Sequence, residues 1–286
     1  MKKFGIDVSK WQGNFDFKNA QRQGVKFAIL KAGGSDGGYY KDSKFESYYK
    51  NAKSLGLDVG AYYFSTATTR SKGIKEAEQF ISYLKVKQFE LPVYIDVENC
   101  KVNKHSTKNK QGLTDAIIGF CETMEKAGYW VGIYANKNFF QNYMYDKQLQ
   151  QYGHWLAEWS TQITYKCKAG VLGMWQFGGE TNKIRTNKVA GQVCDQDYLL
   201  VDYPSKIKAK GKNGFSKSSS SSVSYYHRYR GKTKSLVDAL NSLGINSSFD
   251  YRQKIAKANG ISNYEGTAQE NTTLLDLLKE GKLIKA

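Results

Sequence analysis

The stretch Pro92-Val93-Tyr94-Ile95-Asp96-Val97-Glu98 guides the interpretation of the whole chain. Its first residues are apolar and β-prone, and proline at the first position of a strand does little harm to the hydrogen-bond ladder. Alternate residues of a strand point to the same face, so Asp96 and Glu98 project together. Most Asp-x-Glu pairs are surface charges or caps, but this pair follows an apolar strand. Two such close carboxyl groups do not both ionise readily, and the one that keeps its proton can serve as a general acid.

Strands and helices alternate on both sides of this stretch. Apolar runs predict strands at residues 4–9, 27–32, 59–65, 92–97, 130–135, 154–159, 173–177 and 192–199, and helical periodicity predicts helices at residues 15–23, 42–55, 72–87 and 113–127. This alternation is typical of a mainly parallel sheet with helical crossovers. Up to eight strands favour closure, so we expect an α/β fold with a TIM-like (β/α) barrel that becomes irregular in its last third.

Acidic residues also stand near the ends of the first and last predicted strands. Asp7 lies in Phe4-Gly5-Ile6-Asp7-Val8-Ser9, and Asp195 lies in Val193-Cys194-Asp195-Gln196-Asp197. A turn or cap is the ordinary role of an aspartate such as Asp7. The active site of a β/α barrel lies at the carboxyl end of its strands, so a closed barrel would bring these acids to Asp96 and Glu98.

Aromatic residues recur near the same strand ends. The candidates for substrate contacts are Trp11, Tyr62, Tyr134, Trp155 and Trp175. Flat amphipathic rings suit sugar faces, although most aromatic residues fill cores. The Gly33–Gly38 loop lacks the Lys-Ser/Thr of a phosphate loop, and the sequence has no dinucleotide fingerprint or His-Glu-x-x-His motif. We therefore expect a glycan site without a cofactor or a metal.

A set of ordered motifs between residue 3 and about residue 203 resembles family 25 of the glycoside hydrolases. The motifs are Gly5-Ile6-Asp7-Val8-Ser9-Lys10-Trp11-Gln12-Gly13, Gly60-Ala61-Tyr62-Tyr63-Phe64, Asp96-Val97-Glu98, Trp155-Leu156-Ala157 and Trp175-Gln176-Phe177. The resemblance implies a barrel with lysozyme-type N-acetylmuramidase activity, as in phage endolysins and autolysins. The implied substrate is the β-1,4 bond between N-acetylmuramic acid and N-acetylglucosamine in peptidoglycan.

The resemblance also implies roles for the acids. Glu98 matches the family's proton donor, Asp96 its neighbouring carboxylate, and Asp7 and Asp195 further acids of the cleft. Where the family commonly shows Val-Asp-x-Asn, this chain reads Val193-Cys194-Asp195-Gln196-Asp197, so Asp197 is a rival to Asp195. Asp96 and Glu98 come from one strand, which favours a retaining reaction assisted by the 2-acetamido group of the substrate, with Asp96 orienting that group. A nucleophilic Asp96 remains the alternative.

The composition changes after the predicted barrel. No acidic residue occurs between Asp202 and Asp238, and this stretch is rich in Lys and Ser. We predict a catalytic barrel at residues 1–204, a basic linker at residues 205–233 and a small, mainly helical domain at residues 234–286. The last part loosely resembles wall-anchoring modules of the LysM type, so we expect it to bind the cell wall. A dimerisation or stability role is the alternative.

The net charge of +17 favours a polyanionic partner. We expect peptidoglycan as the substrate and anionic wall polymers as further partners of the linker and the C-terminal domain. Nucleic-acid motifs and an apolar stretch long enough for a membrane span do not occur. The four cysteines fit no metal or disulfide pattern and predict buried thiols. The N-terminus lacks the apolar core of a signal peptide, which favours synthesis in the host cytoplasm and release to the wall. The rival functions are a non-catalytic glycan-binding protein and a glycosidase acting on chitin-like polymers.

Overall fold

The computed structural model describes residues 2–99, 105–166, 170–216 and 224–286. The chain divides into two compact units, Met1–Ser218 and Ser219–Ala286. None of the helices in these described ranges has the length and apolar content needed to cross a membrane. Of the four cysteines, Cys121 and Cys194 are free and buried as predicted, whereas Cys100 and Cys167 lie outside the described residues.

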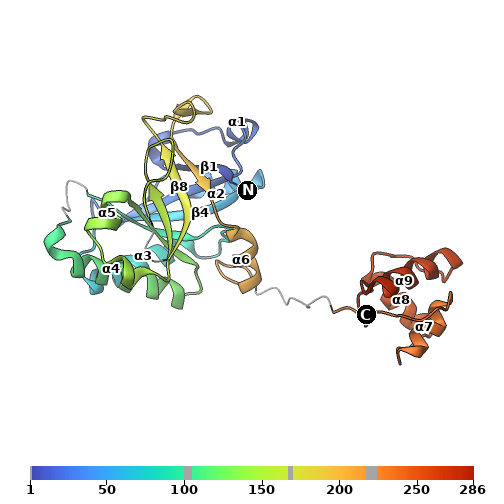
Figure 1. The fold of residues 1–286 in the computed structure, drawn as a ribbon. Coiled ribbons are helices and arrows are strands. Elements are labelled where there is room, and N and C mark those ends of the chain that lie inside the picture. The colour runs from blue at the N-terminus through green and yellow to red at the C-terminus, as the bar shows by residue number, and fades with distance from the viewer. Residues whose placement is uncertain (1, 100–104, 167–169, 217–223) are drawn as a thin grey trace. The chain divides into compact units, whose positions relative to one another are not determined.

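Among the described residues, eight strands close into a barrel in the first unit (Figure 1). They are, in order around the barrel, β1 (Lys3–Val8), β2 (Phe27–Gly34), β4 (Asp58–Ser65), β5 (Val93–Val97), β6 (Val131–Asn136), β7 (Gly153–Ala157), β8 (Val171–Gly178) and β11 (Asp195–Leu199). Parallel pairing runs from β1 to β8, and β11 pairs antiparallel with both β8 and β1. The predicted barrel is therefore confirmed.

Helices cover the outside of the barrel over its first half. They are α1 (Phe17–Arg22), α2 (Phe45–Ser54), α3 (Arg70–Leu84) and α4 (Lys110–Lys126), and the short strand β3 (Tyr40–Lys41) pairs with the end of β2. Helices α3 and α4 pack side by side (Figure 1). After β6, the described chain forms only α5 (Lys137–Asn142) and a 3-10 turn at Asp146–Leu149 before β7 begins.

The irregular last third has a topological cause. Between β8 and β11 the described chain forms a hairpin of β9 (Lys188–Val189) and β10 (Gln192–Val193) and no crossover helix. Parallel neighbours need a long crossover, usually helical, whereas antiparallel neighbours do not. The antiparallel β11 therefore begins at the barrel end where the other strands finish.

Helix α6 (Tyr203–Lys210) closes the opposite end of the barrel, and this finding corrects the predicted linker. Tyr203 and Ile207 are buried in one cluster with the inner residues Phe27 and Trp155. A Cβ at Gly173 would lie 2.0 Å from the hydroxyl oxygen of Tyr203, so glycine is needed for the tyrosine to fit. The linker predicted from residue 205 is wrong at this end, because a mainly polar helix with three buried residues shows little apolar periodicity.

The chain after α6 is also fixed to the barrel. Asn213 is fully buried, accepts a hydrogen bond from the backbone N–H of Trp130 at 2.6 Å and donates one to the carbonyl of Leu91 at 2.8 Å. Trp130 directly precedes β6, and Leu91 lies two residues before the start of β5. The first unit therefore includes residues that composition assigned to the linker.

The second unit is mainly helical, as predicted. It contains α7 (Leu236–Ser242), α8 (Phe249–Ala258) and α9 (Ala268–Glu280), whose buried residues include Leu240, Ile255 and Leu278. A segment ahead of α7 belongs to the same core, because Tyr226 is buried and its N–H donates to the carbonyl of Leu283 at 2.9 Å. The predicted linker end at residue 233 is therefore also wrong.

Candidate active site

Five carboxyl groups gather inside the barrel at the carboxyl end of its parallel strands. They are Asp7 on β1, Asp96 on β5, Glu98 just after β5, and Asp195 and Asp197 on β11. The sequence placed these acids at strand ends, and closure of the barrel brings them together. The electrostatic influence of Glu98 on Asp7, Asp96 and Asp195 reflects this convergence.

Asp96 and Glu98 form the centre of this carboxyl group cluster. Asp96 is 4 % exposed, and burial followed by the charge of Glu98 raises its pKa well above the ordinary value. Burial also raises the pKa of Glu98, while Lys31 and a hydrogen bond with Asp96 oppose that rise. A carboxyl group with a raised pKa holds a proton that it can donate, as a general acid must.

Lys31 on β2 is the cation of this site, and sequence analysis missed it. Its ammonium lies 4.8 Å from the centre of the Phe64 ring and 5.9 Å from that of Tyr62. Its charge lowers the pKa of both Asp96 and Glu98. The available signal was a lysine inside an otherwise apolar strand, in Phe27-Ala28-Ile29-Leu30-Lys31-Ala32. Such a residue faces a polar interior or solvent.

Gln176 on β8 orients Asp7, and sequence analysis did not select it as a site residue. Its Nε2 donates to Oδ2 of Asp7 at 2.9 Å. Its Oε1 accepts hydrogen bonds from the hydroxyl of Tyr134 at 3.1 Å and from Nε1 of Trp159 at 3.0 Å. These two donors fix the amide so that its N–H groups face Asp7. Burial and then Asp197 raise the pKa of Asp7, and the bond from Gln176 opposes them.

The two aspartates of β11 occupy different depths. Asp197 is fully buried and accepts a hydrogen bond from Nε1 of Trp155 at 2.7 Å. Asp195 is only partly buried, and burial followed by the charges of Asp7 and Glu98 raises its pKa to about 8. Asp195 is thus the more accessible of the two rivals, and Asp197 supports the floor of the site.

The five predicted aromatic contacts separate into four groups. Tyr62 and Tyr134 are partly exposed on the inner face, and their rings lie 6.0 and 4.5 Å from that of Trp155. Trp155 itself is 1 % exposed and lies beneath them, so its prediction as a substrate contact is wrong. Trp11, which follows β1, is 79 % exposed and free to meet a ligand at this end.

Trp175 lies on the outer side of the barrel wall, and its prediction as a substrate contact is also wrong. It packs with Phe177 and Tyr198, and its Nε1 donates to the carbonyl of Glu158 at 2.8 Å. The neighbouring Gln176 points inward, and adjacent strand residues point to opposite faces. Trp159, by contrast, follows β7, is 38 % exposed and joins the site through Gln176.

The site's polar groups are carboxylates, an amide, phenols and an ammonium. Within the described ranges, no group of three or more His, Cys, Asp or Glu side chains is arranged to hold a metal ion. Protonated and ionised carboxyl groups beside exposed aromatic rings suit acid–base cleavage of a sugar–sugar bond.

Comparison with known proteins identifies a family. The model of "Glycosyl hydrolases family 25" matches residues 6–185. The solved structure of a family 25 glycosyl hydrolase from Bacillus anthracis is 25 % identical, with a TM-score of 0.57, over 70 % of this chain and 89 % of that one.

Two curated relatives match shorter segments. Lysozyme M1 of Streptomyces globisporus is 40 % identical over 78 residues, which are 27 % of this chain and 26 % of that protein. The L-alanyl-D-glutamate peptidase of Listeria phage A118 is 42 % identical over 90 residues, which are 31 % of each chain. The matches thus span less than a third of either relative.

Proposed function

The chain belongs to glycosyl hydrolase family 25, and from that membership and the geometry of its site we propose that it is an N-acetylmuramidase. Its substrate is the β-1,4 bond between N-acetylmuramic acid and N-acetylglucosamine in bacterial peptidoglycan. The observation that carries the proposal is the pair of the buried Asp96 and the partly buried Glu98, which lie at the carboxyl end of a closed barrel and have raised pKa values. No metal or organic cofactor is part of the proposal.

In the proposed reaction, Glu98 donates its proton to the glycosidic oxygen as the bond to the anomeric carbon breaks. The 2-acetamido oxygen of the substrate attacks that carbon and forms a cyclic intermediate. Glu98 then takes a proton from water, which opens the intermediate with retention of configuration. Lys31 limits the rise of the acid's pKa, and Asp7 and Asp195 line the space near the developing positive charge.

We assign to Asp96 the role of orienting the 2-acetamido group of the substrate. Its Oδ1 is buried and has no hydrogen-bond partner among the described residues. A buried carboxylate oxygen without a partner is costly, and the N–H of an acetamido group would satisfy it. The alternative is a nucleophilic Asp96. A thio-substituted acetamido substrate separates the two, because normal turnover of that substrate contradicts assistance by the acetamido oxygen.

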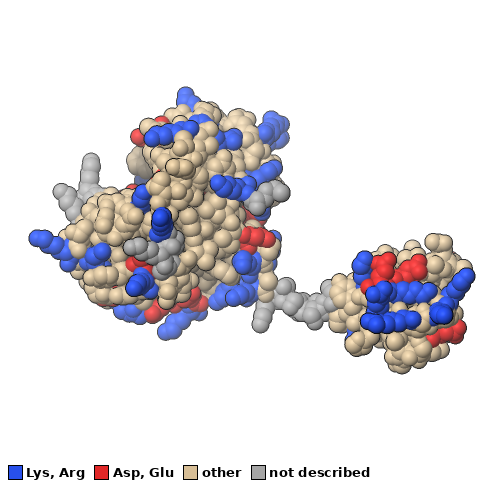
Figure 2. Space-filling model, in the orientation of Figure 1, with Lys and Arg blue, Asp and Glu red and all other residues tan. Residues whose placement is uncertain are grey.

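We assign cell-wall binding to the second unit. Such a unit raises the local concentration of the enzyme at its substrate. Lys and Arg side chains gather on the visible face of this unit (Figure 2), which suits anionic wall polymers. The resulting protein is an endolysin-type enzyme that acts on the wall after release from the cytoplasm.

The decisive experiment is digestion of purified Gram-positive peptidoglycan, with new reducing ends identified by mass spectrometry. We expect muramic acid ends from the wild type and about 100-fold to 10,000-fold fewer from Glu98→Gln, because general acid catalysis contributes a factor of that order. Glu78→Gln on α3 is the matched control, since it removes an exposed carboxyl group and should keep full activity.

Other outcomes redirect the proposal. Glucosamine reducing ends would mean that the protein is a glycosidase that cleaves the other glycosidic bond of peptidoglycan. Cleavage of chitin alone would mean that its substrate is a different polymer. Binding without any new ends would support the rival interpretation, a non-catalytic glycan-binding protein.

A further inference from the structure

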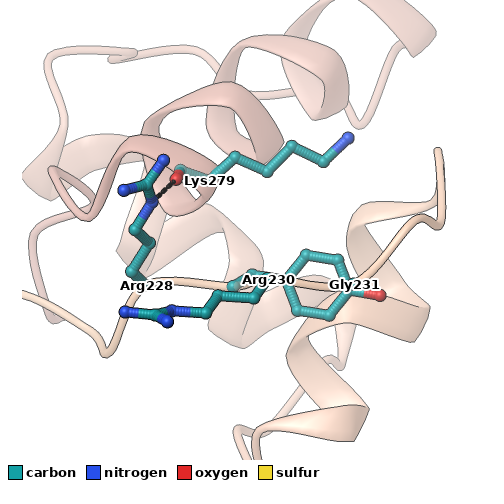
Figure 3. A pocket seen from close by; sticks show the side chains of 5 residues that line it. Arg228, Arg230, Gly231 and Lys279 are labelled. Carbon is teal, nitrogen blue, oxygen red and sulfur yellow. Dashed lines mark hydrogen bonds between the residues drawn. The ribbon is translucent and has the colours of Figure 1, made fainter.

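A pocket of about 510 Å³ in the second unit is lined mainly by cationic side chains (Figure 3). Its lining residues are Arg228, Tyr229, Arg230, Gly231 and Lys279. Figure 3 shows the guanidinium groups of Arg228 and Arg230 projecting to the same side, while Lys279 comes from the end of α9. The pocket therefore concentrates positive charge from two segments of the chain.

The backbone that carries the two arginines is held in place. The N–H of Tyr229 donates to the carbonyl of Leu278 at 3.1 Å, and Nε of Arg228 donates to the carbonyl of Lys279 at 2.6 Å. Gly281 lies directly beneath Arg228, since a Cβ there would be 3.4 Å from Cβ of Arg228. A segment fixed in this way loses little further freedom when a ligand binds.

The positive charge of this pocket is only partly compensated, because Glu280 interacts electrostatically with Arg228. Among the ion pairs of the described residues, none includes Arg228, Arg230 or Lys279. The neighbouring Glu280 pairs with Lys282 at 2.8 Å. Cations often complement the negative end of a helix, and this accounts for Arg228 and Lys279 at the end of α9. It does not require Arg230, whose positive charge adds to that of Arg228 and Lys279.

We propose that this pocket binds the phosphate groups of a phosphodiester polymer in the bacterial wall. Guanidinium groups present paired donors that match phosphate oxygens. Lys279 also lines the pocket, and its side chain extends away from the two guanidinium groups (Figure 3). This inference rests on the proposed function, because it places the second unit at the wall. It adds the ligand class and the residues that recognise it.

The test measures binding of the full chain to soluble poly(glycerol phosphate). The pocket variant is Arg230→Ser/Lys279→Ser, which keeps the hydrogen bond from Arg228 to the backbone carbonyl of residue 279. The control is Lys254→Ser/Lys257→Ser, which removes two other cations of the same unit from α8. We expect the pocket variant to bind at least about 10-fold more weakly and the control to change by less than about 3-fold, as loss of charge-assisted bonds implies.

Three results would overturn the proposal. These are equal weakening by both double variants, equal binding of polyglutamate of matched length, and undiminished binding to walls from which hydrofluoric acid has removed the phosphate polymers. Cleavage of soluble glycan fragments is measured in parallel and should be the same for all variants. A chain that binds poly(glycerol phosphate) through the pocket but cleaves no glycan would refute the proposed function and leave the pocket assignment intact.

Discussion

Asp7 on β1 and Asp195 on β11 are direct partners in the antiparallel strand pair that closes the barrel. Directly opposed residues in such a pair point to the same face, so both carboxyl groups enter the site. Asp195 is near the start of its strand. It nevertheless lies at the same end of the barrel as the acids that stand at the ends of the parallel strands. Burial, and then the charge of Asp7, raise its pKa to about 8.

This relationship predicts how stability depends on pH. A folded-state pKa raised from 3.8 to about 8 means that folding favours the protonated form of Asp195. The associated stability is complete below the lower value and is lost as pH rises towards the higher one. The amide side chain of Asp195→Asn does not titrate. The free energy of unfolding of this variant, relative to that of the wild type, should therefore increase as the pH rises across that interval.

All five tryptophans lie in the first unit, so their fluorescence follows its unfolding in urea. The difference between the midpoints of Asp195→Asn and the wild type should be larger near pH 9 than near pH 4, as linkage requires. Glu78→Gln provides the control for loss of an exposed acid. A difference that stays constant with pH would contradict the raised pKa.

Lys31 should set the alkaline limit of activity. Its charge lowers the pKa of Glu98, so Lys31→Met should raise that pKa and keep the general acid protonated to higher pH. The descending limb of kcat/KM against pH should therefore move to higher pH. Lys31→Arg keeps the charge and should leave the limb in place. A limb that stays or moves lower in Lys31→Met would show that Glu98 does not control it.

Two tryptophans should behave in opposite ways. Trp11→Ala removes an exposed ring at the site's end and should raise KM by about 3-fold to 10-fold with little loss of stability, as loss of a stacking contact implies. Trp175→Phe should leave KM unchanged and lower the free energy of unfolding by about 1 kcal/mol, because the indole N–H bond to Glu158 is lost. Steady-state kinetics and urea denaturation separate the two effects, and a raised KM in Trp175→Phe would refute the outward placement.

Helix α6 should be necessary for the barrel. Ile207→Ala removes a fully buried side chain and should cost roughly 2 to 4 kcal/mol of stability, measured by tryptophan fluorescence in urea. Lys206→Ala, at an exposed position of the same helix, is the control. A chain ending at Ser216 should fold and cleave soluble glycan, whereas one ending at Pro204 should not fold stably. Equal stability of these two truncated chains would contradict the role of α6.

The sequence by itself determined the features that depend on local periodicity. Apolar runs and helical spacing located the barrel strands and most helices, and the two-residue spacing of Asp96 and Glu98 placed both acids on one face. Leucine spacing likewise located the helices of the second unit. These patterns repeat within a few residues, so they need no knowledge of distant partners.

Only the tertiary structure decided which aromatic residues face the site and where the first unit ends. The pairing of β7 with β8 shifts register beside Trp155, and that of β8 with β11 shifts beside Asp197. A shift of one residue exchanges the two faces of a strand, so sequence alone could not assign Trp155 to the floor and Trp175 to the outside. The role of α6 depends on Tyr203 entering a space left by distant glycines. Such fits arise from contacts between segments far apart in the chain, and no local pattern encodes them.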